Sequence, residues 1–217
     1  FAITDDKVCC QASTQEIIRR YFQYMCAHAL GNADKIAADR VKLLMDDLGI
    51  TEFDRKVVAP ARAAAEEAEQ QPGKGSGNVF CGAALELPDG TIVTGKNSPL
   101  LHAASSCILN AIKVLAKLPD DLYLLSPQVI DSVSQLKKKI YKNKGLSLDL
   151  GETLTALSVS VPNNPAAQLA MKKLSRLAGC EMHISHLPTP GDELALRRLG
   201  IRITSEPCFT SRNLFME

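Results

Sequence analysis

The chain has 217 residues, of which 46% are hydrophobic and 23% are charged, a composition typical of a globular protein with a packed core. Its 25 basic and 24 acidic side chains leave a net charge of +1, which excludes a strong global attraction to nucleic acid or acidic membranes. No apolar stretch approaches the roughly 18–20 residues of a membrane span, and no signal peptide is recognisable. We therefore expect a cytoplasmic protein without a nucleic-acid or membrane partner.

The seven cysteines are odd in number, scattered, and mostly placed within apolar patterns. This favours reduced, buried thiols over a disulfide framework. The five lysines between 137 and 144 are the one local concentration of charge, and they are typical of a solvated helix face near a C-terminus. The chain begins with Phe1 rather than methionine, which suggests a piece of a longer protein.

Residues 1–70 are expected to form a helical region. Ser13 and Glu16 have capping-box spacing, and an apolar stripe over 17–26 follows them. A second stripe, at 41–48, is followed by an alanine-rich third helix. Because short isolated helices are marginally stable, both stripes must bury against a partner surface. We expect that surface to be the protein's own amino-terminal region or a second copy of the chain.

Residues 71–78 predict a linker, since their GKGSG lacks the spacing and the preceding strand of a Walker phosphate loop. From residue 79 onward, strand-like segments alternate with helical ones. The region 79–217 therefore predicts a three-layer α/β domain with a mixed, mainly parallel sheet. Strands are expected at 79–87, 91–96, 121–125, 153–161, 180–184 and 201–205.

The segment 153–185 carries the clearest local pattern. A β-branched run ends at Pro162, Pro165 can open a helix, Gly179 can close it, and a second extended run follows. This order predicts a βαβ unit with a parallel strand pair. Such units hold ligands at the carboxyl ends of their strands, where helical N–H groups are free.

Three predicted corners between a strand and a helix pair small polar residues with a proline. Helix capping alone explains this composition, but corners that meet at one edge of a sheet would also bind a small anionic molecule. Three residue groups form this predicted anion site: Lys96, Asn97 and Ser98 at the first corner, Ser126 at the second, and Asn163 and Asn164 at the third.

A polar cluster is expected on the strand at 180–184. Alternation places Glu181, His183 and Ser185 on one face, and Cys180 and His186 on the other. Three metal ligands therefore cannot converge, and we expect no metal. The carboxylate of Glu181 could raise the proton affinity of His183, and the hydroxyl of Ser185 could orient a ligand.

The order of strands and helices also resembles the cytidine-deaminase-like arrangement. A zinc deaminase requires a His or Cys two residues before a catalytic glutamate, and a later Pro-Cys-x-x-Cys. His102 is followed by Ala104 instead of the glutamate, and Cys208 has no second cysteine three residues later. The sequence thus predicts neither deamination nor any cofactor.

Several segments carry a family resemblance: CQASTQEIIRRYF, LELPDGTIVTGK, LSPQVIDSVSQLK, ALSVSVPNNPAAQLAM, LAGCEMHIS and RRLGIRITSEP. They resemble the bacterial family of unknown function DUF1846, from about residue 1 to residue 208. The resemblance implies members of about twice this length, with a glycine-rich, GPGSGK-like loop in an amino-terminal part. This chain would then be the carboxy-terminal half. The family pattern differs at Ile184 and His186, and it implies no activity.

We therefore expect a ligand-binding or regulatory and assembly domain of a larger protein, with an anionic small molecule at the three corners. The alternative is the substrate-binding half of a nucleotide-dependent enzyme whose catalytic loop lies in a missing amino-terminal part. No complete set of catalytic residues is recognisable in the sequence.

Overall fold

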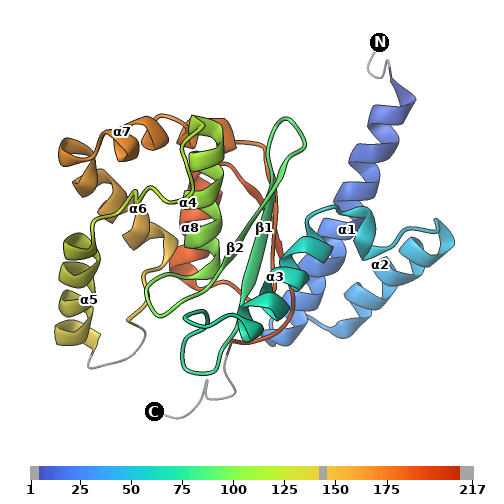
Figure 1. Cartoon of the computed structure of the whole chain (residues 1–217). Helices are drawn as coiled ribbons and strands as arrows, with labels where there is room; N and C mark the ends of the chain where they lie inside the picture. Colours follow the sequence, from blue (N-terminus) through green and yellow to red (C-terminus); the bar gives the residue numbers. More distant parts are fainter. Residues whose placement is uncertain (1–4, 142–145, 211–217) are drawn as a thin grey trace.

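The computed structural model describes residues 5–141 and 146–210 (Figure 1). It confirms an α/β protein with a helical amino-terminal region. The α-helices are α1 (Asp6–Ala29), α2 (Lys35–Asp47), α3 (Val58–Gln70), α4 (Ala103–Ala116), α5 (Pro127–Tyr141), α6 (Leu150–Ser160), α7 (Pro165–Met171) and α8 (Pro190–Arg198). The strands are β1 (Gly82–Glu86), β2 (Ile92–Lys96), β3 (Glu181–Ile184) and β4 (Arg202–Ser205), and short 3₁₀ turns are η1 (Glu52–Asp54), η2 (Val161–Asn163) and η3 (Leu174–Leu177).

The four strands form one mixed sheet in the order β2-β1-β3-β4. β1 pairs antiparallel with β2 and with β3, placing Leu85 opposite both Val93 and Met182. Only β3 and β4 are parallel, with α8 as their crossover. The sheet is mixed, as predicted. The expected majority of parallel pairs was wrong, because two segments predicted as parallel strands are not strands.

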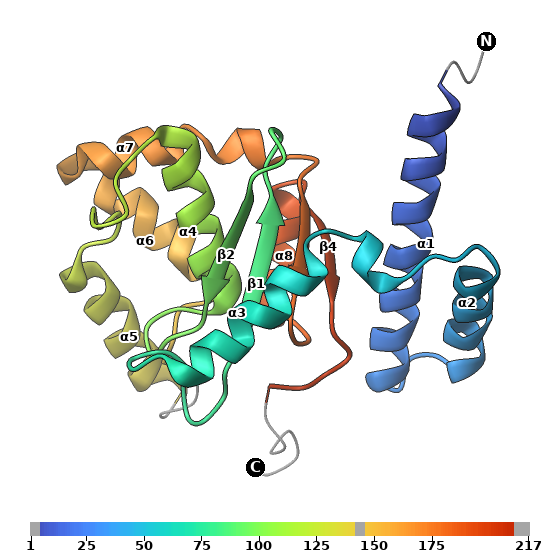
Figure 2. The same cartoon turned by 45° about the vertical axis from the view of Figure 1, so that its right-hand side comes forward.

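Helices cover both faces of the sheet, which confirms the three-layer arrangement (Figure 2). Ala83 and Leu85 of β1 belong to the large core that they share with α4, α6 and α8. Ala84, between them, packs on the opposite face against Ala61 of α3. This alternation is the pattern of a strand that is buried on both sides.

The predicted strand at 153–161 was wrong, because these residues form most of α6 and the start of η2. A capping box starts α6: Asp149 Oδ1 accepts the N–H of Glu152 at 2.9 Å, and Glu152 Oε2 accepts the N–H of Asp149 at 2.9 Å. Leu150 and Leu157, two helical turns apart, are fully buried. Capping and helical periodicity therefore outweigh the β-branched composition, and the predicted βαβ unit at 153–185 is absent.

Other boundaries differ from the predictions in smaller ways. Residues 121–125 are irregular rather than a strand, and α4 begins at Ala103, several residues after the first predicted corner. Ser13 and Glu16 lie inside α1, which Asp5 caps. Lys142 and Lys144 of the predicted basic face lie outside the described residues.

The helical region packs against the sheet: α3 lies across β1 and β2, and α1 contacts the edge strand β4. Ile18 and Phe22 of the stripe at 17–26 are buried with Met45 of α2 and Val58 of α3. The ring of Phe22 lies 4.7 Å from that of His183 in β3, centroid to centroid. The stripe at 17–26 is thus covered by the same chain.

All seven cysteines lie within the described residues and are free, and Cys81, Cys107 and Cys180 are buried. Among residues 5–141 and 146–210, no helix combines the length and apolar character that crossing a bilayer requires.

Two glycines let helices approach the sheet closely. A Cβ at Gly95 of β2 would collide with the backbone of Cys107 in α4, and one at Gly82 of β1 would collide with the backbone of α3. Neither helix backbone can move away as a flexible side chain would. The distances from α4 and α3 to the sheet therefore depend on these two glycines.

We expect Gly95→Ala to destabilise the chain by about 3 kcal/mol or more, because α4 must shift to admit one methyl group. Urea unfolding monitored by circular dichroism measures this. Gly151→Ala in α6 is the control: its Cβ would meet only the side-chain oxygen of Asp149, at 3.3 Å. Equal stability of the two variants would contradict the close-packing interpretation.

Candidate functional site

The carboxyl ends of β2, β3 and β4 lie at one edge of the sheet. Because β2 and β3 both run antiparallel to β1, and β4 runs parallel to β3, all three end at the same edge (Figure 2). Helices α4 and α8 follow β2 and β3, and both begin at this edge. Open α/β sheets commonly hold ligands at such an edge.

A cavity of about 630 Å³ lies beside the end of β2. Its volume falls within the range of small-molecule sites, roughly 300–1,000 Å³. The walls come from β2, α4, the first turns of α5 and the irregular segment before α5. Tyr123, which is 82% exposed, stands on this segment. The apolar lining consists of Leu100, Leu101, Leu109, Leu122, Leu124, Leu125 and Ile130.

Three lysines and two aspartates give the cavity lining a small positive charge. The ammonium of Lys96 lies 2.7 Å from a carboxylate oxygen of Glu67, whose side chain is mostly exposed. Lys113 donates a 2.7 Å hydrogen bond to the carbonyl of Asp120. Lys74 forms no ion pair with any described residue. The lysines are thus held by weak or neutral partners that an anion could replace.

Of the residues predicted for the anion site at the end of β2, some line the cavity and others only stabilise the fold. Lys96 and Ser98 line the cavity. Asn97 is buried outside it, and its Oδ1 accepts the N–H of Cys81 at 2.8 Å, which fixes the strand ends. Ser185 is also structural, because its hydroxyl accepts the first N–H of β1 at 2.9 Å.

The second and third corners differ from each other. Ser126 caps α5 by accepting the N–H of Val129 at 3.2 Å, next to the cavity wall. Asn164 caps α7 and donates a 2.8 Å hydrogen bond to the carbonyl of Tyr123, so it holds the cavity wall without lining the cavity. Asn163 is exposed on η2. Since α6 precedes it, the third corner joins two helices rather than a strand and a helix.

The predicted cluster of Glu181, His183 and Ser185 does not form. The carboxylate beside His183 is that of Glu206, at 3.0 Å, while Glu181 binds arginines. Burial lowers the pKa of His183 below its usual value, and the hydrogen bond with Glu206 offsets this only in part. The prediction that Glu181 raises the proton affinity of His183 was therefore wrong. As predicted, Cys180 lies on the other face, in the main core.

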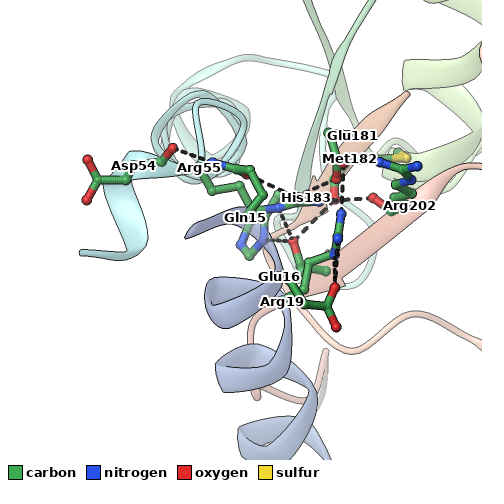
Figure 3. A network of polar contacts seen from close by, with 10 residues as sticks. Gln15, Glu16, Arg19, Asp54, Arg55, Glu181, Met182, His183 and Arg202 are labelled. Carbon is green, nitrogen blue, oxygen red and sulfur yellow. Dashed lines mark hydrogen bonds and ion pairs between the residues drawn. The ribbon is translucent and has the colours of Figure 1, made fainter. Parts of the chain in front are cut away.

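Glu181 instead belongs to a network that fastens the helical region to the sheet (Figure 3). Arg55, 1% exposed, donates to Glu181 Oε2, and Arg19 of α1 donates to Glu181 Oε1 at 2.9 Å. The other Arg55 N–H groups reach the Thr204 hydroxyl at 2.9 Å, the backbone carbonyls of β3 and β4, and Gln15. Burial lowers the pKa of Arg55, and the charge of Glu181 opposes this.

The residues at the helix starts do not match a zinc deaminase. The order of elements also differs from the expected one, because three α-helices, α5, α6 and α7, lie between α4 and β3. His102 precedes α4, but Ala104 stands where the catalytic glutamate is required. The later helix, α8, begins Pro190-Gly191-Asp192 without a cysteine. Within the described ranges, no group of three His, Cys, Asp or Glu side chains is arranged to hold a metal.

Sequence reasoning missed several cavity residues. Lys74 lay in the predicted linker, and Tyr123 lay in a predicted strand. Lys113, on α4, lies in the cavity lining because of the packing of α4 on β2 and the path of the segment around Asp120. No local pattern in the sequence encodes that long-range arrangement.

A family model described as "Domain of unknown function DUF1846, C-terminal" matches residues 53–215, and its N-terminal counterpart matches residues 1–49. The chain therefore belongs to the DUF1846 family. The expectation of a carboxy-terminal half alone is corrected, because residues 1–49 match the N-terminal model.

Similar proteins carry only the name UPF0371 protein. One from Clostridium botulinum (strain Alaska E43) is 44% identical over 216 residues, which are 99% of this chain and 42% of that protein. One from Clostridioides difficile (strain 630) is 43% identical over 216 residues, with the same two shares. One from Fusobacterium nucleatum is 42% identical over 217 residues, 99% of this chain and 43% of that protein. The chain thus spans less than half the length of these relatives.

We expect Arg55→Met to destabilise the chain by about 3–5 kcal/mol, because it removes the buried partner of Glu181, which keeps only Arg19 and Arg202, and a donor to two backbone carbonyls. Urea unfolding measures the loss. Arg20→Met, which removes an exposed ion pair with Glu16, is the control and should change little. If both variants unfolded at the same urea concentration, the network would not stabilise the fold.

Proposed function

We propose that this chain is a ligand-binding module that takes a small molecule with a phosphate or carboxylate group in the cavity beside β2. The observation that carries this proposal is that the cavity lining combines several leucines with the lysines Lys96 and Lys74. Small-molecule sites usually combine a largely apolar wall with a few polar groups that fix orientation.

The charges around the cavity support an anion rather than a cation. Lys96 has a carboxylate partner, Glu67, but that side chain is mostly exposed, so a bound anion could take its place at little cost. Pro127, the first residue of α5, also lines the cavity, so the positive end of this helix borders it. The leucines would accept the apolar or aromatic part of the ligand.

The test is a thermal-unfolding assay with charged and uncharged partners of the same shape: AMP with adenosine, and glucose 6-phosphate with glucose. At an anion concentration of about 100 times its Kd, binding would raise Tm by roughly 5–10 °C. We expect such a rise with at least one anion and not with its neutral partner.

Lys96→Met and Lys74→Met should each remove most of the rise, because they remove the positive charge at the border of the cavity. Lys138→Met, on the exposed side of α5, is the matched control and should keep it. The proposal fails if no anion raises Tm, or if the rise persists unchanged in both cavity variants.

A second role, in assembly, is favoured by the exposed apolar side of α2. Ile36 and Leu43 lie two turns apart and are 59% and 64% exposed, and Leu48 follows at 56%. α2 lies within the part that matches the family's N-terminal model, which covers only residues 1–49 here. We propose that in the longer relatives this side of α2 packs against the rest of that amino-terminal domain.

The chain alone should then stay at its monomer mass of 23.5 kDa and bind an apolar dye such as ANS. Leu43→Glu should reduce dye binding, whereas Leu169→Glu, an exposed leucine on α7, should not. Light scattering distinguishes the alternative: a dimer that returns to the monomer mass on Leu43→Glu would mean that a second copy covers α2.

A further inference from the structure

A second, smaller cavity lies where α4 and α8 begin, at the same edge of the sheet. Its volume is about 160 Å³, and it shares no lining residue with the cavity beside β2. Most of its lining residues are polar, among them His102, His186, Ser147 and Thr189. This cavity is therefore separate from the proposed anion site.

Two of the elements that surround this cavity are joined by a short hydrogen bond between a histidine and an aspartate. Nδ1 of His102, at the start of α4, lies 2.7 Å from Oδ2 of Asp192 in α8. Asp192 is almost fully buried, and it also accepts the Thr189 hydroxyl at 2.8 Å and the N–H of Leu150 at 2.8 Å. These contacts fix the ring of His102 and direct Nδ1 away from any ligand.

The same contacts set the charges of the pair. Burial would lower the pKa of His102, but the hydrogen bond and charge of Asp192 raise it above its usual value. Burial would raise the pKa of Asp192, but His102, Thr189 and Leu150 together hold it below its usual value. The Nε2 atom of His102 hydrogen-bonds to no described residue, so it is the atom of the pair left for a ligand.

His186 is the unexplained group in this cavity. It is 8% exposed, and its Nδ1 atom is buried without a hydrogen-bond partner among the described residues. Burial lowers its pKa to about 4, so the ring is neutral at pH 7. A buried polar atom without a partner costs stability, which a fold tolerates most readily where a ligand supplies the partner.

We propose that this cavity binds a compact, uncharged, hydroxyl-bearing molecule between His186 and the ring of His102 that Asp192 orients. A hydroxyl both donates and accepts, so it can bond Nδ1 of the neutral His186 ring in either tautomer. A second hydroxyl on the same molecule would meet Nε2 of His102.

The size of the cavity limits the ligand. A cavity of about 150 Å³ accepts a six-carbon ring, so this one has room for about six to eight heavy atoms. The thiol of Cys81 also lines the cavity, but burial and the charge of Asp192 raise its pKa to about 12. It stays protonated at neutral pH, so the cavity is a polar binding site rather than one with a thiolate nucleophile.

The test uses glycerol, a six-atom polyol, as the probe in an NMR titration of the ring nitrogens of the four histidines. We expect a saturable shift of the His186 and His102 signals, with a Kd in roughly the millimolar range for so few atoms. The exposed His28 is the internal control and should not shift. An unshifted His186, or an equal shift at His28, would overturn the proposal.

A variant separates binding from a purely structural role. His186→Leu should raise Tm by at least about 2 °C, because it removes a buried polar atom without a partner. It should also abolish the response of His102 to glycerol. His28→Leu is the matched control and should leave that response intact. A lower Tm for His186→Leu would show that the histidine is held by polar contacts of its own and would overturn the proposal.

Discussion

A guanidinium that is 1% exposed is tolerated only when each of its N–H groups finds an acceptor, and Arg55 meets this condition with acceptors from α1, β3 and β4. The hydrogen bonds of Arg55 therefore determine where η1 lies relative to the parallel strand pair. The start of α3 follows η1, so the position of α3 over β1 depends on them too. The outer layer of helices is thus held by polar contacts of Arg55 as well as by apolar packing.

The edge at which β2, β3 and β4 end has a different physical character from the rest of the sheet. Away from this edge, β1 is covered on both faces by apolar side chains. At this edge two helices begin, a buried aspartate pairs with a histidine, and two separate cavities lie. Close packing on glycines and a network of buried charges make the sheet rigid, and rigid elements position ligand-binding groups more accurately than loops do.

The sequence predicted those parts of the fold whose signals are local. The hairpin β1–β2 follows from two apolar runs and the turn at 88–90, and β3–α8–β4 follows from short alternating segments with a clear helix between them. The β-branched residues of 153–161 favoured a strand, while the capping box of Asp149 with Glu152, which decides for a helix, was overlooked. Lys96 and Ser98 were predicted for the site because they lie at the end of a predicted strand. Lys113, and the pair of His102 and Asp192, depend on packing between distant segments, which local patterns do not reveal.

The contact of Arg19 with Glu181 has a consequence for the longer relatives. Arg19 belongs to the segment that matches the family's N-terminal model, and Glu181 belongs to the segment that matches its C-terminal model. The formal boundary at residues 49–53 is therefore bridged by an ion pair and by the shared packing of Phe22 on His183. Helices α1 and α2 should travel with the sheet as one rigid unit. Any opening and closing of the full-length proteins would then need its pivot somewhere other than this boundary.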